Sequence, residues 1–289
     1  MKLLEKFTNI EALNFALTNR FPRRLVTLFF GWFSRIEHPV VVSTSLWIWR
    51  TFTHGLNLEE AAKQEFSSLH DCFIRELKPG ARVVDDRQNV ITSPCDAVVG
   101  EIGRLQDKVA LQIKGAPYSI VDLLGDEARA REFADGLFIT LRLKSTMYHR
   151  FHAPCDGSVD AINYISGDVW NVNPAALKRV PQLFCKNERV LLPITASLPE
   201  VRLMLVPVAA VLVASLQLHG LDYPLNLKYQ GSNEIALQRE FHKGDELGYF
   251  QHGSSIVILA KGPVSLAAGI RAGDTIRVGE ALLDVTSPF

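Results

Sequence analysis

The sequence predicts an α+β protein in which a helical N-terminal region packs on a β-rich domain, built as a sandwich or a barrel. Two observations support this division. Apolar residues in the first sixty positions recur at helical spacing or in aromatic runs. From about residue 83, short β-branched segments instead alternate with glycine-containing turns. The expected units are therefore residues 1–80 and residues 81–289.

The predicted helical region contains three apolar segments and one further amphipathic stretch. These are the repeat Leu3, Phe7, Ile10, Leu13 and Leu17, which Pro22 ends; the run Leu25 to Phe33 after Arg23 and Arg24; the group Trp47-Ile48-Trp49; and Glu59 to Leu77, which Lys78-Pro79-Gly80 ends. Arginine mixed with Trp, Phe and Leu is typical of a helix that rests on a membrane surface. It also fits a helical layer on the protein's own core. Both interpretations stay open, and they can hold for different faces.

Nine segments of the second unit have strand character. They are Val83-Val84, Val98-Val99, Val109 to Ile113, Leu137 to Leu143, Arg189 to Ile194, Val201 to Ser215, Ile235 to Arg239, Ser255 to Ala260 and Thr275 to Val278. Many short strands with regular turns are typical of a β sandwich or barrel.

Composition excludes several classes of protein. Lys+Arg and Asp+Glu both number 31, and this balance argues against nucleic acid as the main partner. The four cysteines match no zinc spacing and are interpreted as free thiols. Glu5 and Lys6 interrupt the apolar start, so no signal peptide is expected. The longest apolar run, Leu203 to Leu218, contains Pro207 and favours buried strands over a membrane span.

Three polar clusters carry the candidate chemistry. Asp96 lies in a turn before a predicted strand, His149 and His152 lie three residues apart, and Gly253-Ser254 precedes the apolar run at Ile256. A serine needs a neighbouring base to become a nucleophile, histidine suits that role, and a carboxylate can orient the imidazole. The clusters therefore suggest a relay of Asp96, His152 and Ser254. No third ligand accompanies the histidines, so no metal is expected.

The chain resembles bacterial phosphatidylserine decarboxylases from about Phe66 to Val285. The blocks that carry the resemblance are Phe73 to Gly80, Pro94-Cys95-Asp96, Gln112 to Gly115, Tyr148 to Gly157, Gly167-Asp168, Asn187 to Val190, and Lys243 to Phe250 leading into Gly253-Ser254-Ser255. Two positions depart from the family's pattern. Ala97 stands where Gly is common, and His252-Gly253-Ser254-Ser255 replaces a Leu-Gly-Ser-Thr motif. The Gly-Ser pair that the chemistry requires is kept.

The resemblance implies a self-cleaving proenzyme. His152, oriented by Asp96, would deprotonate Ser254, which would attack the carbonyl of Gly253. The products would be a β chain, residues 1–253, and an α chain, residues 254–289, which stay together as a heterodimer. Ser254 would become a covalent pyruvoyl group, the cofactor, which binds the substrate amine as a Schiff base. His149 is the expected contact of the substrate carboxylate or the proton donor.

The implied reaction turns phosphatidylserine into phosphatidylethanolamine and CO₂, as a step of phospholipid biosynthesis. Residues 1–80 would then associate with membrane lipid, and the protein would be peripheral on the cytoplasmic side of the cell membrane. No nucleic-acid partner is expected, and a homo-oligomer is left open.

Two rival interpretations remain. One is a carrier domain of the biotinyl or lipoyl type, which the segments Gly244 to Gly248 and Ala272 to Gly279 resemble. The other is a serine hydrolase that uses the same relay without self-cleavage.

Overall fold

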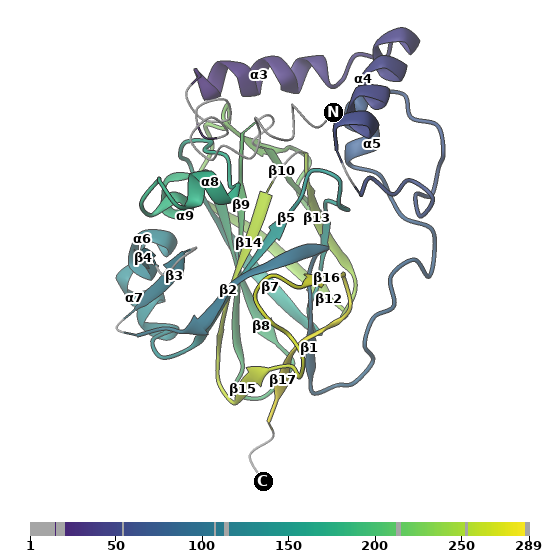
Figure 1. Cartoon of the computed structure of the whole chain (residues 1–289). Helices are drawn as coiled ribbons and strands as arrows, with labels where there is room; N and C mark the ends of the chain where they lie inside the picture. The colour runs from purple at the N-terminus through teal and green to yellow at the C-terminus, as the bar shows by residue number, and fades with distance from the viewer. Residues whose placement is uncertain are drawn as a thin grey trace.

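The computed structural model describes residues 15, 21–53, 55–106, 108–112, 116–211, 215–251 and 254–286. A β body forms the bulk of the molecule, and the N-terminal helices lie at one end of it (Figure 1). The helices are α3 (Arg23–Phe33), α4 (Pro39–Phe52), α5 (Leu69–Phe73), α6 (Ile120–Leu124), α7 (Glu127–Glu132), α8 (Pro174–Leu177) and α9 (Leu183–Lys186).

An eight-stranded antiparallel sheet runs through the β body in the order β12-β7-β8-β9-β14-β5-β2-β16. Its strands are β2 (Ala97–Arg104), β5 (Leu137–Leu143), β7 (Gly157–Ile165), β8 (Arg189–Ala196), β9 (Arg202–Ala209), β12 (Glu234–Phe241), β14 (Ser254–Lys261) and β16 (Thr275–Ile276). Within it β14 lies between β5 and β9, and Ser254 is paired with Leu143 and Ala209. The start of β14 is therefore held on both sides by a backbone ladder.

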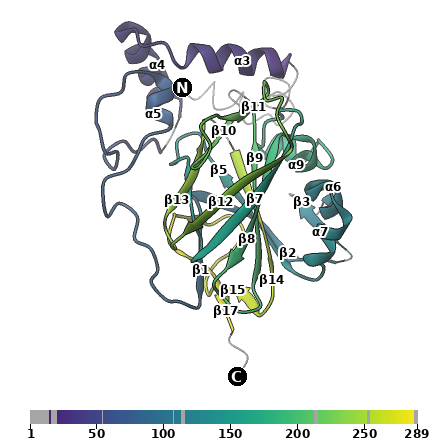
Figure 2. The same ribbon diagram turned by 180° about the vertical axis from the view of Figure 1, so that it is seen from behind.

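Smaller sheets complete the body. Their strands are β1 (Val90–Thr92), β3 (Val109–Gln112), β4 (Ala116–Ser119), β6 (Arg150–His152), β10 (Ser215–Leu218), β11 (Leu225–Asn226), β13 (Glu246–Phe250), β15 (Val264–Leu266) and β17 (Ala281–Val285). The orders are β11-β10-β13-β6, β1-β17-β15 and β3-β4. Figure 2 shows β10, β11 and β13 from the opposite side, together with β7 and β12 of the long sheet.

Two apolar cores flank the long sheet, and β14 contributes to both. Ile256 and Ile258 belong to the core shared with the smaller sheets, whereas Val257 and Leu259 pack with the helices α6, α8 and α9. This alternation follows from the two-residue period of a strand. A strand buried on both faces reads as a continuous apolar run, and the sequence after Ser255 has that form.

The α+β class with a β-rich core is confirmed, and the architecture is one of open antiparallel sheets. In the described part of the chain, the long sheet ends at β12 and β16 rather than closing. Four predicted strands, Leu137 to Leu143, Arg189 to Ile194, Ile235 to Arg239 and Ser255 to Ala260, are confirmed within one or two residues at each end. All five residues of the predicted repeat from Leu3 to Leu17 lie outside the described residues. Within that stretch only Phe15 is described.

The predicted helix from Glu59 to Leu77 is largely wrong, because only Leu69–Phe73 is helical. The Ser68 side chain caps α5 by accepting the backbone N–H of Asp71, and the Asp71 carboxylate in turn accepts the N–H of Ser67. Such local side-chain bonds compete with a continuous helix. The predicted strand at Val83-Val84 is also wrong, since both residues are in coil.

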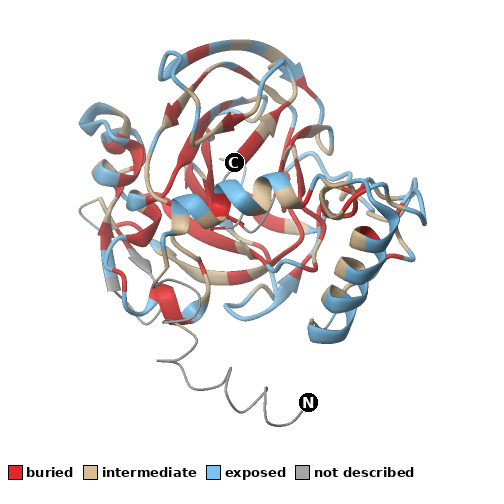
Figure 3. Ribbon diagram, turned by 90° about the horizontal axis from the view of Figure 1, so that it is seen from above, coloured by how far each residue is buried: buried red, intermediate tan, exposed pale blue. Residues whose placement is uncertain are grey.

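The helices α3 and α4 carry large apolar side chains on their outer faces. The exposed ones are Leu25, Leu28, Phe29, Trp32, Val40, Trp47, Ile48 and Phe52. Seen from above in Figure 3, α3 lies across the end of the β body with exposed and half-buried residues, and α4 stands beside it and is mostly exposed. Among the described residues, every helix is too short or too polar to cross a membrane.

Two arginines join α3 to the β body. Arg23 at its start pairs with Asp168 at 2.6 Å and stacks on the Trp170 ring, 3.6 Å from its centroid. Arg35, just past its end, donates to Gln251 Oε1 at 2.6 Å. The inner face of α3 thus belongs to the protein's own structure while its outer face remains apolar and exposed.

Candidate active site

Ser254 is the first residue of β14 and is completely buried. Its hydroxyl has no hydrogen-bond partner among the described residues. A buried hydroxyl without a partner carries a desolvation cost, and such groups in native proteins usually have a functional explanation. The predicted scissile partner Gly253 lies outside the described residues, as does His252.

A cavity of about 380 Å³ opens beside Ser254, and we call it the Ser254 cavity. Its lining combines apolar and polar side chains from four parts of the chain besides Ser254. They come from α5, from the end of β5, and from the segments after β7 and β9: Phe73, Arg142, Leu143, Lys144, Ser145, Asn171, Val172, Asn173, Ala210 and Val211. A cavity with a few convergent polar groups is the usual form of a small-ligand site.

His149 is fully buried immediately before β6. Its Nδ1 lies 2.8 Å from the carbonyl oxygen of Met147, which can only accept, so Nδ1 carries the proton. The other nitrogen, Nε2, has no partner among the described residues. Burial lowers the pKa of His149 to about 3, so the ring is neutral near pH 7 with Nε2 as a free acceptor.

Phe73 links His149 to Ser254. The Phe73 ring lies 4.1 Å from the His149 ring, centroid to centroid, and also lines the Ser254 cavity. The imidazole therefore packs against one side chain of the cavity that Ser254 also lines.

His152, at the end of β6, uses both ring nitrogens. Nδ1 lies 2.8 Å from the carbonyl of Gly244, and Nε2 lies 3.0 Å from the Tyr148 hydroxyl. Because the carbonyl accepts, Nδ1 donates, and Nε2 accepts the Tyr148 proton. Burial lowers the pKa of His152, and the Gly244 bond and the charges of Glu246 and Asp96 only partly offset this. His152 is thus a neutral imidazole near pH 7.

Asp96 is nine-tenths buried and is held in the turn between β1 and β2 by Arg82. The guanidinium contacts both carboxylate oxygens, with Nε 2.8 Å from Oδ1, and the backbone N–H of Val278 also donates to Oδ1 at 2.9 Å. Arg82 also donates to Glu60 at 2.8 Å. Bidentate Arg–carboxylate pairing is among the stronger polar contacts in proteins.

The structure brings the predicted residues together only in part. The backbone N–H of His152 donates to the carbonyl of Pro94 at 2.7 Å, so the turn that contains Asp96 lies next to β6. The relay predicted a direct hydrogen bond between Asp96 and His152. Instead, the Asp96 carboxylate accepts from Arg82, and the His152 ring bonds to the Gly244 carbonyl and the Tyr148 hydroxyl. Asp96 still acts on His152 through its charge. The catalytic roles of all four residues stay predictions.

Sequence reasoning missed five residues in and around this region. Phe73 and Tyr148 stand in blocks that carry the family resemblance, and Asn187-Glu188 stands in another, so those blocks were the available signal. Arg82 had no signal, because an ion pair between residues 14 positions apart follows no fixed spacing.

Glu188 is a buried acid immediately before β8. It is 1% exposed, its Oε1 accepts the Tyr164 hydroxyl at 2.6 Å, and its Oε2 has no partner among the described residues. Burial raises the pKa of Glu188 to about 7, although the Tyr164 bond and Arg24 favour the charged form. Glu188 therefore binds a proton more tightly in the folded protein than in the unfolded chain.

We expect Glu188→Gln to stabilise the protein at alkaline pH. The folded-state pKa lies above the unfolded value, so the stability linked to this proton is present at low pH and is lost as pH rises from about 4.5 through about 7. The amide removes that loss, which amounts to up to about 3 kcal/mol at pH 8 and nothing near pH 4. Urea unfolding of both proteins at the two pH values measures the difference. An equal difference at both would contradict the assignment.

Comparison with known proteins places the chain in a family. The model of the family described as phosphatidylserine decarboxylase matches residues 69–284. The phosphatidylserine decarboxylase proenzyme of Vibrio cholerae serotype O1 is 33% identical over 258 residues, covering 83% of this chain and 87% of that protein. Those of Pasteurella multocida and Shewanella putrefaciens are 31% and 30% identical, covering 98% and 96% of this chain and 99% and 100% of theirs.

The β-rich fold and the matched family define an enzyme of the decarboxylase class. The chain belongs to the phosphatidylserine decarboxylase family. The resemblance predicted from the blocks between Phe66 and Val285 is thereby confirmed.

Proposed function

We propose that this protein decarboxylates phosphatidylserine to phosphatidylethanolamine with a pyruvoyl group made from Ser254 by self-cleavage. One observation carries the proposal: Ser254 has a fully buried, unpartnered hydroxyl beside a cavity, at the start of a strand held on both sides. The relatives named above are described as proenzymes, in agreement with a precursor that is processed.

The processing chemistry follows from the position of Ser254. Its oxygen attacks the Gly253 carbonyl, and the peptide bond becomes an ester while the Ser254 nitrogen takes the hydroxyl proton through a base. Loss of the Ser254 α-proton then expels residues 1–253 as a carboxylate. The remaining dehydroalanine takes up water and releases ammonia. We assign the base role to His152, which is neutral and buried, with Asp96 favouring its charged form.

The surroundings of Ser254 fit a pyruvoyl group. Such a group supplies a carbonyl that binds the substrate amine and accepts electrons as CO₂ leaves. The Ser254 cavity has room for a small headgroup, and Lys144, Asn171 and Asn173 offer polar contacts within it. We assign the return of a proton to the reacting carbon to His149, whose ring packs against Phe73 of the cavity lining and whose Nε2 has no partner among the described residues.

We further propose that the protein works as a peripheral protein at the cytoplasmic side of the cell membrane. The outer face of α3 and α4 presents the aromatic and aliphatic side chains that interfacial helices bury among lipid headgroups. Residues 1–80 would be this membrane-associating region, and 81–289 the catalytic domain. The β and α chains, residues 1–253 and 254–289, would remain together because β14 is paired on both sides.

Two lysines argue against the carrier interpretation. A carrier domain presents a free lysine at a hairpin tip, but Lys243 Nζ donates to the carbonyls of Arg87 and Asp85. Lys261 Nζ donates to the carbonyl of Ala134. Both side chains near the proposed hairpins are therefore engaged by backbone.

Intact mass of the purified protein tests the proposal. We expect two chains divided between Gly253 and Ser254, the smaller of which lacks an N-terminal amine and reacts with a carbonyl reagent. A single chain with an added group would favour a carrier, and a single unmodified chain would favour a serine hydrolase. An uncut protein that still decarboxylates would sink the pyruvoyl mechanism.

A further inference from the structure

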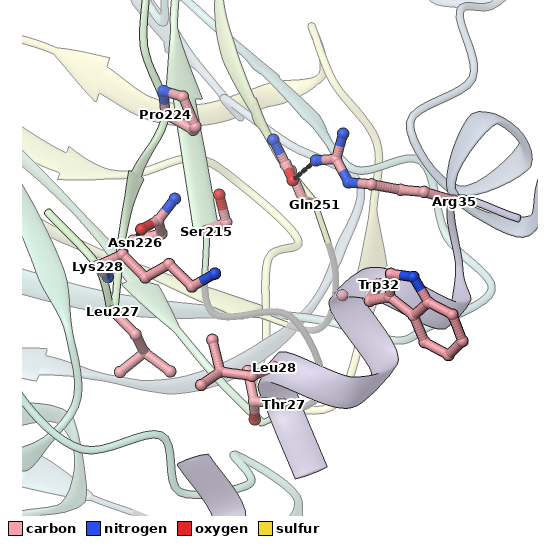
Figure 4. A pocket seen from close by; sticks show the side chains of 11 residues that line it. Thr27, Leu28, Trp32, Arg35, Ser215, Pro224, Asn226, Leu227, Lys228 and Gln251 are labelled. Atoms are coloured by element: carbon pink, nitrogen blue, oxygen red, sulfur yellow. Dashed lines mark hydrogen bonds between the residues drawn. The ribbon is translucent and has the colours of Figure 1, made fainter. Parts of the chain in front are cut away.

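A second pocket, which we call the α3 pocket, lies between α3 and the β body. It holds about 280 Å³ and is separate in its lining from the Ser254 cavity. Figure 4 shows that its walls come from α3 on one side and from β10, β11 and the residues around Lys228 on the other.

Two cations approach this pocket from opposite sides. Arg35 reaches in from the end of α3, and Lys228 points toward it from the strand side (Figure 4). The described lining contains no acidic residue, and Arg35 contacts the neutral oxygen of Gln251 at 2.6 Å. Among the described residues neither cation forms an ion pair, and two positive charges facing a shared space favour an anion there.

Neutral donors complete the pocket. Ser215 is 5% exposed, and its hydroxyl has no partner among the described residues. Gln251, also 5% exposed, accepts the Arg35 hydrogen bond through its carbonyl oxygen, and its NH₂ group is a further donor in the lining. Cations combined with hydroxyl and amide donors form the usual environment of a phosphate oxygen.

The position of the pocket indicates which anion it receives. Gln251 stands three residues before Ser254, and Ser215 accepts the Gln251 backbone N–H at 3.0 Å through its carbonyl. On the outer side the lining includes Leu28 and Trp32, which belong to the exposed apolar face of α3. An anion held here has the proposed reaction centre on one side and an apolar surface suited to acyl chains on the other.

We propose that the α3 pocket binds the phosphodiester of the phospholipid substrate, with Lys228 and Arg35 as its two cations. The assignment rests on the proposed function for the identity of the lipid. It goes beyond that function because it says how the headgroup is oriented: the phosphate lies under α3 and the serine moiety points toward Ser254.

Binding to the uncut Ser254→Ala chain tests the assignment without requiring activity. The probes are dihexanoyl phosphatidylserine, dihexanoyl phosphatidylethanolamine and inorganic phosphate, measured by calorimetry. We expect Lys228→Gln to weaken both lipids about tenfold, the usual effect of losing a charge-assisted hydrogen bond. Lys228→Arg should retain most of the affinity. Inorganic phosphate should bind far more weakly than either lipid.

Each other outcome overturns a defined part of the proposal. Weakening of phosphatidylserine alone would assign the pocket to the carboxylate, since phosphatidylethanolamine lacks one. Equal affinity for inorganic phosphate would remove the lipid assignment. Unchanged lipid binding in Lys228→Gln would end the proposal. Lys186→Gln, an exposed lysine at the end of α9, is the matched control.

The processed enzyme provides a second measurement. Lys228→Gln should still divide into two chains and should raise KM for phosphatidylserine about tenfold with little change in kcat. Failure of the parent chain to cut or decarboxylate would count against the proposed function only, because the lipid-binding comparison does not depend on it.

Discussion

Replacing His152 with alanine should leave the chain as a single uncut polypeptide without decarboxylase activity. His152 is buried and neutral, and its Nδ1–H is fixed on the Gly244 carbonyl, so Nε2 is the nitrogen able to take a proton. Losing a general base slows a reaction by about 100-fold or more. Intact mass at increasing times after purification measures the cut. Normal division of His152→Ala would remove this residue from self-processing.

Two further histidine variants serve as comparisons for His152→Ala. His242→Ala changes an exposed histidine, 90% accessible, and should cut normally. His149→Ala should also cut, but the divided enzyme should turn over slowly, because we place His149 in the decarboxylation step. If His149→Ala stays uncut while His152→Ala divides, the two roles are exchanged. Thermal unfolding of each variant shows that the fold is retained.

The strands buried on both faces could be predicted from sequence, and those buried on one face were often missed. Leu137–Leu143 is almost wholly apolar between Gly136 and Lys144, so its limits were visible. Gly157–Ile165 was missed although it has nine residues, because Ser158, Asp160 and Asn163 interrupt its apolar positions. Its position next to β12, toward the edge of the long sheet, makes those polar residues acceptable.

The site shows a similar limit. Motif blocks located His149, His152 and Ser254, yet the bonds that set the histidine tautomers go to the carbonyls of Met147 and Gly244. Every residue supplies a carbonyl, so sequence carries no signal for such a contact. The same holds for Arg82, whose pairing with Asp96 depends on how the segment between α5 and β1 runs along the body (Figure 1).

Replacing Asp96 with asparagine should both destabilise the protein and slow the cut. Asp96 is 6% exposed, and the change leaves the Arg82 guanidinium facing a neutral amide inside the protein. Breaking a buried ion pair typically costs about 3–5 kcal/mol, and the remaining Glu60 contact to Arg82 places the expected loss near 3 kcal/mol. Asp85→Asn is the matched control. Its partner Arg87 is exposed, so this change should cost less than about 1 kcal/mol.

The rate of cutting distinguishes a structural Asp96 from one that assists His152. The carboxylate charge favours a protonated His152, so its loss makes the imidazole a weaker base even in the folded protein. We therefore expect Asp96→Asn to cut more slowly at temperatures well below its own unfolding transition. A variant that loses stability as expected but divides at the parent's rate would confine Asp96 to holding Arg82 and the turn before β2. The base function of His152 would then rest on the Gly244 bond, the Tyr148 bond and the charge of Glu246.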